Sequence, residues 1–168
     1  MSLADNYPDT IERIFAKYPV KRSAIIYLLY LAQHEYGYIS DQAVADVAGL
    51  LDADPTEVRA VAGFYSLFFK RPVGKFVLHF CNDLPCALRG ADDFLKLLAD
   101  KLGVQPGETT PDGLFTLEAA MCLAACDRAP MMQVNLEYHE DLTEEKVDHL
   151  LAALRQRAQV EEKTHPIP

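Results

Sequence analysis

The hydrophobic pattern of the chain changes its period at residues 70–75, and this change divides the molecule in two. Before this segment, apolar residues recur at helical spacing; after it, short apolar runs typical of strands alternate with helical stretches. Pro72 and Gly74 interrupt both patterns. We therefore predict a helical domain over residues 1–70, an α/β domain over residues 75–158, and a disordered polar tail over residues 159–168.

The first part of the sequence predicts four short helices that form a small bundle. Capping boxes are expected at Asp9–Glu12 and Asp54–Glu57, and Gly37 is expected to end the second helix. The last helix is expected to extend through the aromatic run FYSLFF, residues 64–69. Because a helix buries one stripe only, part of this run is expected to pack on the second domain or on a partner.

The second part of the sequence predicts four strands and two helices. Their order, strand–helix–strand–strand–strand–helix, indicates a small three-layer α/β domain of thioredoxin type. The strands are expected at residues 75–80, 114–121, 130–135 and 136–139, and the helices at residues 91–103 and 143–158.

Four cysteines lie in two close pairs, and each pair follows a predicted strand. Cys81 and Cys86 are spaced C-x4-C, and Cys122 and Cys126 are spaced C-x3-C. The helix and strand between the pairs allow the two strand ends to lie side by side, at the edge where α/β folds usually place their sites. Four thiolates that converge there suit either zinc or a [2Fe–2S] cluster.

The spacing favours the cluster over zinc. Structural zinc sites usually take C-x2-C turns, whereas plant-type ferredoxins begin with a C-x4-C loop. Zinc remains an alternative, as do two disulfides or four ordinary buried thiols. Since the N-terminal residues lack the pattern of a secretory signal, we expect a reducing compartment, where structural disulfides are uncommon.

Charge and hydropathy disfavour several classes of partner. The net charge of −9 disfavours nucleic acid and anionic lipid surfaces. The longest apolar run, residues 24–32, is shorter than the roughly 20 residues that a bilayer core requires. We therefore expect a cytoplasmic protein without direct membrane insertion.

The segments FCNDLPCALRGA and MCLAACDRAPMMQVN resemble the thioredoxin-like [2Fe-2S] ferredoxin family. Within it, AKYPVKRSAIIYLLYLAQHEYGYIS, VAGFYSLFF and PGETTPDGLFTL make the chain similar to the E-type subunits of respiratory NADH:quinone oxidoreductases. The resemblance implies one [2Fe–2S] cluster on Cys81, Cys86, Cys122 and Cys126.

The same resemblance implies an electron-transfer role without catalytic residues on this chain. NADH and FMN are then expected on a neighbouring flavin-bearing subunit, within a larger complex peripheral to the inner membrane. Two alternatives stay open: the same module in a soluble NAD-linked hydrogenase or formate dehydrogenase, and a zinc-stapled interaction module without redox activity. A thioredoxin-like or peroxiredoxin-like enzyme would need a free thiol of low pKa.

One residue departs from the family pattern. Members usually carry glycine two residues after the third ligand, where this chain has Ala124. If that position requires a positive φ, alanine costs about 1 kcal/mol there. Because the sequence shows no functional return for such strain, we expect the loop to have relaxed into an ordinary conformation.

Overall fold

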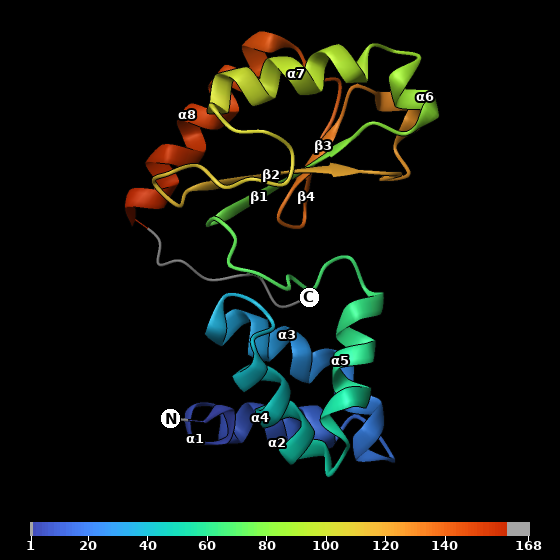
Figure 1. Ribbon diagram of the computed structural model, residues 1–168, viewed down its shortest axis with the longest axis vertical. Coiled ribbons are helices and arrows are strands. Elements are labelled where there is room, and N and C mark those ends of the chain that lie inside the picture. The colour runs from blue at the N-terminus through green and yellow to red at the C-terminus, as the bar shows by residue number, and fades with distance from the viewer. Residues whose placement is uncertain (1, 161–168) are drawn as a thin grey trace. The chain divides into compact units, whose positions relative to one another are not determined.

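The computed structural model describes residues 2–160, and its contacts divide the chain into two units between Pro72 and Val73. Each unit has a separate hydrophobic core. The first consists of helices and the second of a sheet with helices (Figure 1). The cysteine pairs all belong to the second unit.

The helical unit contains more elements than the sequence predicts. The four predicted helices are present as α2, α3, α4 and α5, and a short α1 precedes them. Its core is built mainly from α3 and α4, which contribute Leu28, Leu29 and Val47, all fully buried. The elements are α1 (Leu3–Asn6), α2 (Pro8–Phe15), a 3-10 turn η1 (Lys21–Ala24), α3 (Ile25–Tyr36), α4 (Asp41–Leu51) and α5 (Pro55–Phe64).

Local capping explains where three of these helices begin or end. Gly37 ends α3 with φ +77°, as predicted. The Ser40 side chain accepts from the Ala43 N–H at 3.1 Å at the start of α4. Asp54 accepts from the Thr56 N–H at 2.7 Å at the start of α5, which confirms Asp54 as the cap.

Both predicted capping boxes are wrong in detail. The helix α2 begins at Pro8 after Tyr7, so Asp9 lies inside its first turn and cannot cap it. At α5, the carboxylate of Glu57 forms an ion pair with Arg22 instead of the capping-box hydrogen bond to the Asp54 backbone. The observed capping box joins Ser2 and Asp5 at α1.

The aromatic run does not continue the last helix, and that prediction is also wrong. The helix α5 ends at Phe64, whose side chain is 82% exposed. Phe68 is buried in the turn beyond this helix, and its ring centroid lies 4.8 Å from that of Tyr30. Gln33 of α3 holds this turn, since its amide donates to the Leu67 carbonyl at 2.9 Å. In a continuous helix Phe64 and Phe68 would share one face, so it is the turn that leaves Phe64 exposed while Phe68 is buried.

The second unit has the predicted order of elements around a four-stranded sheet. The strands lie in the order β2-β1-β3-β4, with β1 and β2 parallel and the other pairs antiparallel. A short helix α6, which the sequence did not predict, follows β1. The elements are β1 (Phe76–Cys81), α6 (Leu84–Ala87), α7 (Ala91–Leu102), β2 (Phe115–Ala120), a 3-10 turn η2 (Cys126–Arg128), β3 (Met132–Val134), β4 (Glu137–His139) and α8 (Glu144–Val160).

The α/β unit has two layers, not the three that were predicted. Phe76, Leu78 and Phe80 alternate along β1 and share one core with residues of both α7 and α8. Figure 1 shows these two helices on the same side of the sheet. The helix α7 lies in the connection from β1 to β2, and α8 follows β4. The described part of this unit therefore contains no further crossover helix that could form a third layer.

Two further predictions concern the ends of elements and the membrane. The helix α8 continues to Val160, so residues 159 and 160 of the expected tail are helical, and residues 161–168 lie outside the described residues.

Among residues 2–160, the structure has no helix that is both long and apolar enough to cross a membrane.

Candidate metal centre

The register of the two parallel strands brings the cysteine loops together. Cys81 ends β1 and is paired with Ala120, which ends β2. Beyond these ends, the N–H of Asn82 donates to the Ala120 carbonyl at 3.1 Å, and the Cys81 thiol donates to the Met121 carbonyl at 3.1 Å. Both loops therefore start at the same edge of the sheet, as the sequence predicted.

The four sulfurs differ in their access to solvent. Cys81 and Cys86 are each 1% exposed, Cys81 at the end of β1 and Cys86 within α6. Cys126 opens η2 and is half-buried, whereas Cys122 is exposed. The structure thus places the first pair against the core and the second pair toward the surface.

Two of the thiols have raised pKa values, and neighbouring thiols contribute to both shifts. Burial and a hydrogen bond with the Cys81 side chain raise the pKa of Cys86 to about 12. Burial, together with the charge and hydrogen bond of Cys122, raises the pKa of Cys126. The pKa values of Cys86 and Cys126 rise in part because the negative charges of neighbouring thiolates would be crowded together. A positively charged metal group would remove this conflict.

The loop between Cys122 and Cys126 adopts a left-handed turn at Ala124, with φ +59°. The expectation of a relaxed loop is therefore wrong. The turn directs the Ala124 N–H toward the Cys122 sulfur, at 3.4 Å. Backbone N–H groups presented in this way favour an anionic sulfur, so the strained conformation brings a donor to the Cys122 sulfur, a contact that the sequence did not show.

Two side chains that sequence reasoning missed hold this second loop. The Tyr138 hydroxyl, on β4, donates to the Leu123 carbonyl at 2.9 Å. The Arg89 guanidinium, which follows α6, donates to the Asp127 carbonyl at 3.1 Å. Both bonds reach backbone carbonyls far along the chain, and no motif in the sequence signals such contacts.

The donor set fits a [2Fe–2S] cluster. Such clusters take four Cys thiolates, and the two loops that start at this edge of the sheet carry four free cysteines, Cys81, Cys86, Cys122 and Cys126, that could supply them. Within residues 2–160, no three His, Cys, Asp or Glu side chains gather closely enough to hold one metal ion.

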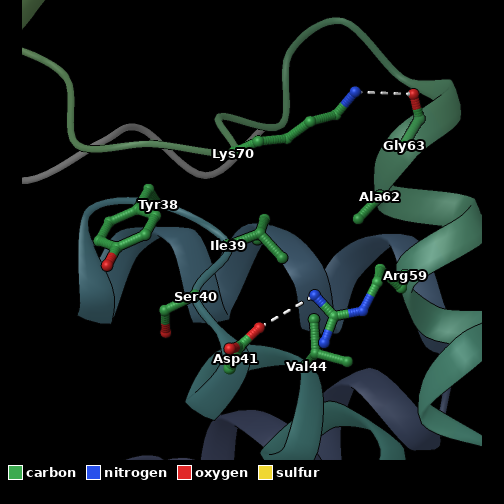
Figure 2. A pocket seen from close by; sticks show the side chains of 9 residues that line it. All are labelled: Tyr38, Ile39, Ser40, Asp41, Val44, Arg59, Ala62, Gly63 and Lys70. Carbon is green, nitrogen blue, oxygen red and sulfur yellow. Dashed lines mark hydrogen bonds and ion pairs between the residues drawn. The ribbon is translucent and has the colours of Figure 1, made fainter.

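A separate hollow of about 510 Å³ lies in the helical unit, between α4, α5 and the turn that follows α3 (Figure 2). Its charged groups are engaged with their neighbours: Arg59 pairs with Asp41 at 3.0 Å, and Lys70 donates to the Gly63 carbonyl at 3.2 Å. The hollow carries no thiol or imidazole. It is lined by Tyr38, Ile39, Ser40, Asp41, Val44, Arg59, Ala62, Gly63 and Lys70.

Comparison with known protein families gives a match over most of the chain. The model described as "Thioredoxin-like [2Fe-2S] ferredoxin" matches residues 11–155. This range includes all four cysteines and parts of both units.

Several curated relatives, named as subunits of NADH-quinone oxidoreductases, are similar over most of their length. Subunit 2 of the Thermus thermophilus enzyme is 42% identical over 165 residues, covering 96% of this chain and 91% of that protein. An E-type subunit of the Rhizobium meliloti enzyme is 42% identical over 147 residues, covering 88% of each. The E-type subunit of the Rickettsia felis enzyme is 45% identical over 143 residues, covering 83% of this chain and 86% of that protein.

A solved structure shares the fold. A chain of an NAD+-reducing [NiFe]-hydrogenase in the air-oxidized state matches with a TM-score of 0.67 and 22% identity. The match covers 84% of this chain but only 25% of the hydrogenase chain. At this identity, the likeness concerns the fold.

Proposed function

The chain belongs to the thioredoxin-like [2Fe-2S] ferredoxin family, and on that premise we propose that it is the electron-transfer subunit of an NADH-quinone oxidoreductase. The observation that carries this proposal is the meeting of two cysteine pairs at the adjoining ends of β1 and β2. The relatives with 42–45% identity, which are subunits of NADH-quinone oxidoreductases, support the same assignment.

All four cysteines take part in this proposal. Cys81, Cys86, Cys122 and Cys126 would hold the cluster. When bound, a [2Fe–2S] cluster supplies one-electron redox chemistry. The buried first pair excludes water from the core side, while the exposed Cys122 lies on the side that a redox partner can approach. The chain itself needs no acid, base or nucleophile for this role.

The proposed partner is a flavin-bearing subunit that oxidises NADH and carries FMN, within a larger complex at the inner membrane. We propose that the helical unit docks this partner. Its support is the pair of aromatic side chains at the end of α5: Phe64 is 82% exposed, and Tyr65, whose ring lies 5.1 Å from that of Phe64, is also exposed. Exposed aromatic side chains of this kind are typical anchors of protein interfaces.

Metal and sulfide analysis of the purified full chain, with absorption and electron paramagnetic resonance spectra, tests the cluster. We expect two irons and two labile sulfides per chain, a coloured protein and a signal that appears on reduction. A colourless protein with one zinc per chain would instead establish the zinc-stapled interaction module.

Purification of the tagged chain from its own host tests the assembly. We expect it to co-purify with a flavin-bearing subunit and with quinone reductase activity driven by NADH. Co-purification with hydrogenase or formate dehydrogenase activity, and without quinone reductase activity, would assign the same module to one of those soluble assemblies. The hydrogenase likeness in fold makes this the alternative to exclude first.

A further inference from the structure

A single peptide group in the second cysteine loop is bound on both of its sides. The group joins Leu123 to Ala124. Its N–H lies 3.4 Å from the Cys122 sulfur, and its carbonyl accepts a hydrogen bond of 2.9 Å from the Tyr138 hydroxyl. The hydroxyl, the peptide and the sulfur therefore form one connected chain of hydrogen bonds.

We propose that Tyr138 is a positioning residue that raises the reduction potential of the site by fixing this peptide against the Cys122 sulfur. The inference rests on the proposed function and extends it. Reduction increases the negative charge on the sulfur ligands, and a hydrogen bond from an N–H group stabilises that charge. A donor that is held in place therefore favours the reduced state.

The peptide needs such a support because Ala124 occupies a conformation that alanine disfavours. With φ +59°, Ala124 would gain by rotation into an ordinary conformation, and this rotation would turn its N–H away from the sulfur. The Tyr138 hydroxyl opposes the rotation by holding the carbonyl on the other side of the same group. It also polarises the peptide, which strengthens the N–H as a donor.

Tyr138 is well placed for this task. It lies on β4, where it is paired in register with Gln133 of β3, so its backbone is fixed by the sheet. The bond from the Cys81 thiol to the Met121 carbonyl uses a thiol proton, which a metal-bound thiolate lacks. The bond from Tyr138 holds this end of the loop without requiring such a proton.

The test replaces Tyr138 by Phe, which removes only the hydroxyl, in the full chain loaded with its cluster. The measurement is a redox titration monitored by paramagnetic resonance. At a fixed potential, the ratio of reduced to oxidised cluster should fall about tenfold in the variant. This corresponds to a reduction potential lower by about 59 mV for a one-electron couple. The matched control is Tyr36→Phe, which removes a hydroxyl bound to Asp46 in the helical unit and should leave the ratio unchanged. An unchanged ratio in Tyr138→Phe would overturn the inference.

A double-mutant cycle with Ala124→Gly shows whether the effect passes through the peptide. Glycine adopts this positive φ without the steric cost that alanine bears, so the peptide depends less on the hydroxyl, and removal of the hydroxyl should lower the potential less in the Ala124→Gly background than in the parent chain. Strictly additive shifts would mean that Tyr138 acts on the site by another route, and the inference would fail.

Two further measurements keep the outcomes separate. If the parent chain contains no iron, the proposed function fails before this inference is tested. If the parent chain contains iron and the Tyr138→Phe variant has the same reduction potential as the parent, only the inference fails. If Tyr138→Phe does not assemble a cluster, amide exchange in the metal-free full chain decides. We expect Ala124 to lose protection in the variant, and unchanged protection there would overturn the inference.

Discussion

Cys81, the last residue of β1, is the register partner of Ala120, the last residue of β2. Because the two strands are parallel, this pairing places the segments that follow them at one edge of the sheet. The first segment leads through α6 to Cys86, and the second leads to Cys122 and Cys126. Proposed ligands far apart in the sequence thus come to the same edge through the end positions of two strands.

Replacement of Cys86 or Cys122 by serine should weaken or alter the cluster in either variant. Serine offers a harder oxygen in place of a soft thiolate, which iron–sulfur clusters prefer. Cluster absorption and paramagnetic resonance measure the effect, and circular dichroism should show that the helices remain folded. Met121→Ser is the matched control, because Met121 is exposed and adjoins Cys122 without being a proposed ligand. A normal spectrum in a cysteine variant would remove that residue from the ligand set.

Ala124→Gly should stabilise the loaded protein by about 1 kcal/mol, since glycine adopts a positive φ without the steric cost that alanine bears. For a chain of this size, the thermal midpoint should rise by about 2–4 °C, and bleaching in air should slow. The control is Ala125→Gly: Ala125 has φ −122°, so glycine there should destabilise by about 0.4–1 kcal/mol through the entropy of the unfolded chain. Equal effects of the two substitutions would contradict the assignment of strain to Ala124.

Features with a local cause could be predicted from the sequence. Gly37 and Asp54 end and cap helices through contacts with their own neighbours, so their residue types are informative. The edge of the sheet at which the cysteine loops begin could be predicted for a similar reason, because each cysteine pair follows a strand whose apolar pattern is visible. The connection between these two strands also suits a parallel crossover.

Features that depend on distant contacts could not be predicted. The helix α1 has four residues and no periodic pattern, and it is held by Asp46 and Glu35, which lie much further along the chain. The positive φ of Ala124 contradicts the preference of alanine itself; the structure associates it with the Cys122 sulfur and the Tyr138 hydroxyl on either side of one peptide. The Cys122 contact is local, but the Tyr138 hydroxyl bonds to a carbonyl 15 residues earlier in the chain, and that contact does not follow from spacing.

Phe64→Ser should weaken binding to the proposed flavin-bearing partner about tenfold, which corresponds to about 1.4 kcal/mol. The Phe64 side chain is 82% exposed, so its loss should leave the stability of the free chain nearly unchanged. Binding to the purified partner, measured by calorimetry, tests this expectation. Val20→Ser is the control, since it removes another exposed apolar side chain of the same unit. Equal binding by Phe64→Ser and the parent chain would remove the end of α5 from the interface.

Asp46→Asn should destabilise the helical unit at neutral pH but much less in acid. Burial by itself would raise the pKa of Asp46, but hydrogen bonds from the Tyr36 hydroxyl, the Leu3 N–H and the Gln42 amide together lower it below the ordinary value of 3.8. A lowered pKa in the folded state contributes stability above pH 3.8, and this contribution is lost as the pH falls through the folded value. We therefore expect denaturant unfolding to show a loss of about 1–3 kcal/mol in the unfolding free energy of Asp46→Asn at pH 7, and a smaller difference from the parent chain at pH 3.

The control is Asp100→Asn, which removes an exposed carboxylate of α7 and should change the unfolding free energy by less than about 0.5 kcal/mol at either pH. A difference between Asp46→Asn and the parent chain that stays constant from pH 7 to pH 3 would show that the carboxylate charge does not hold α1 in place.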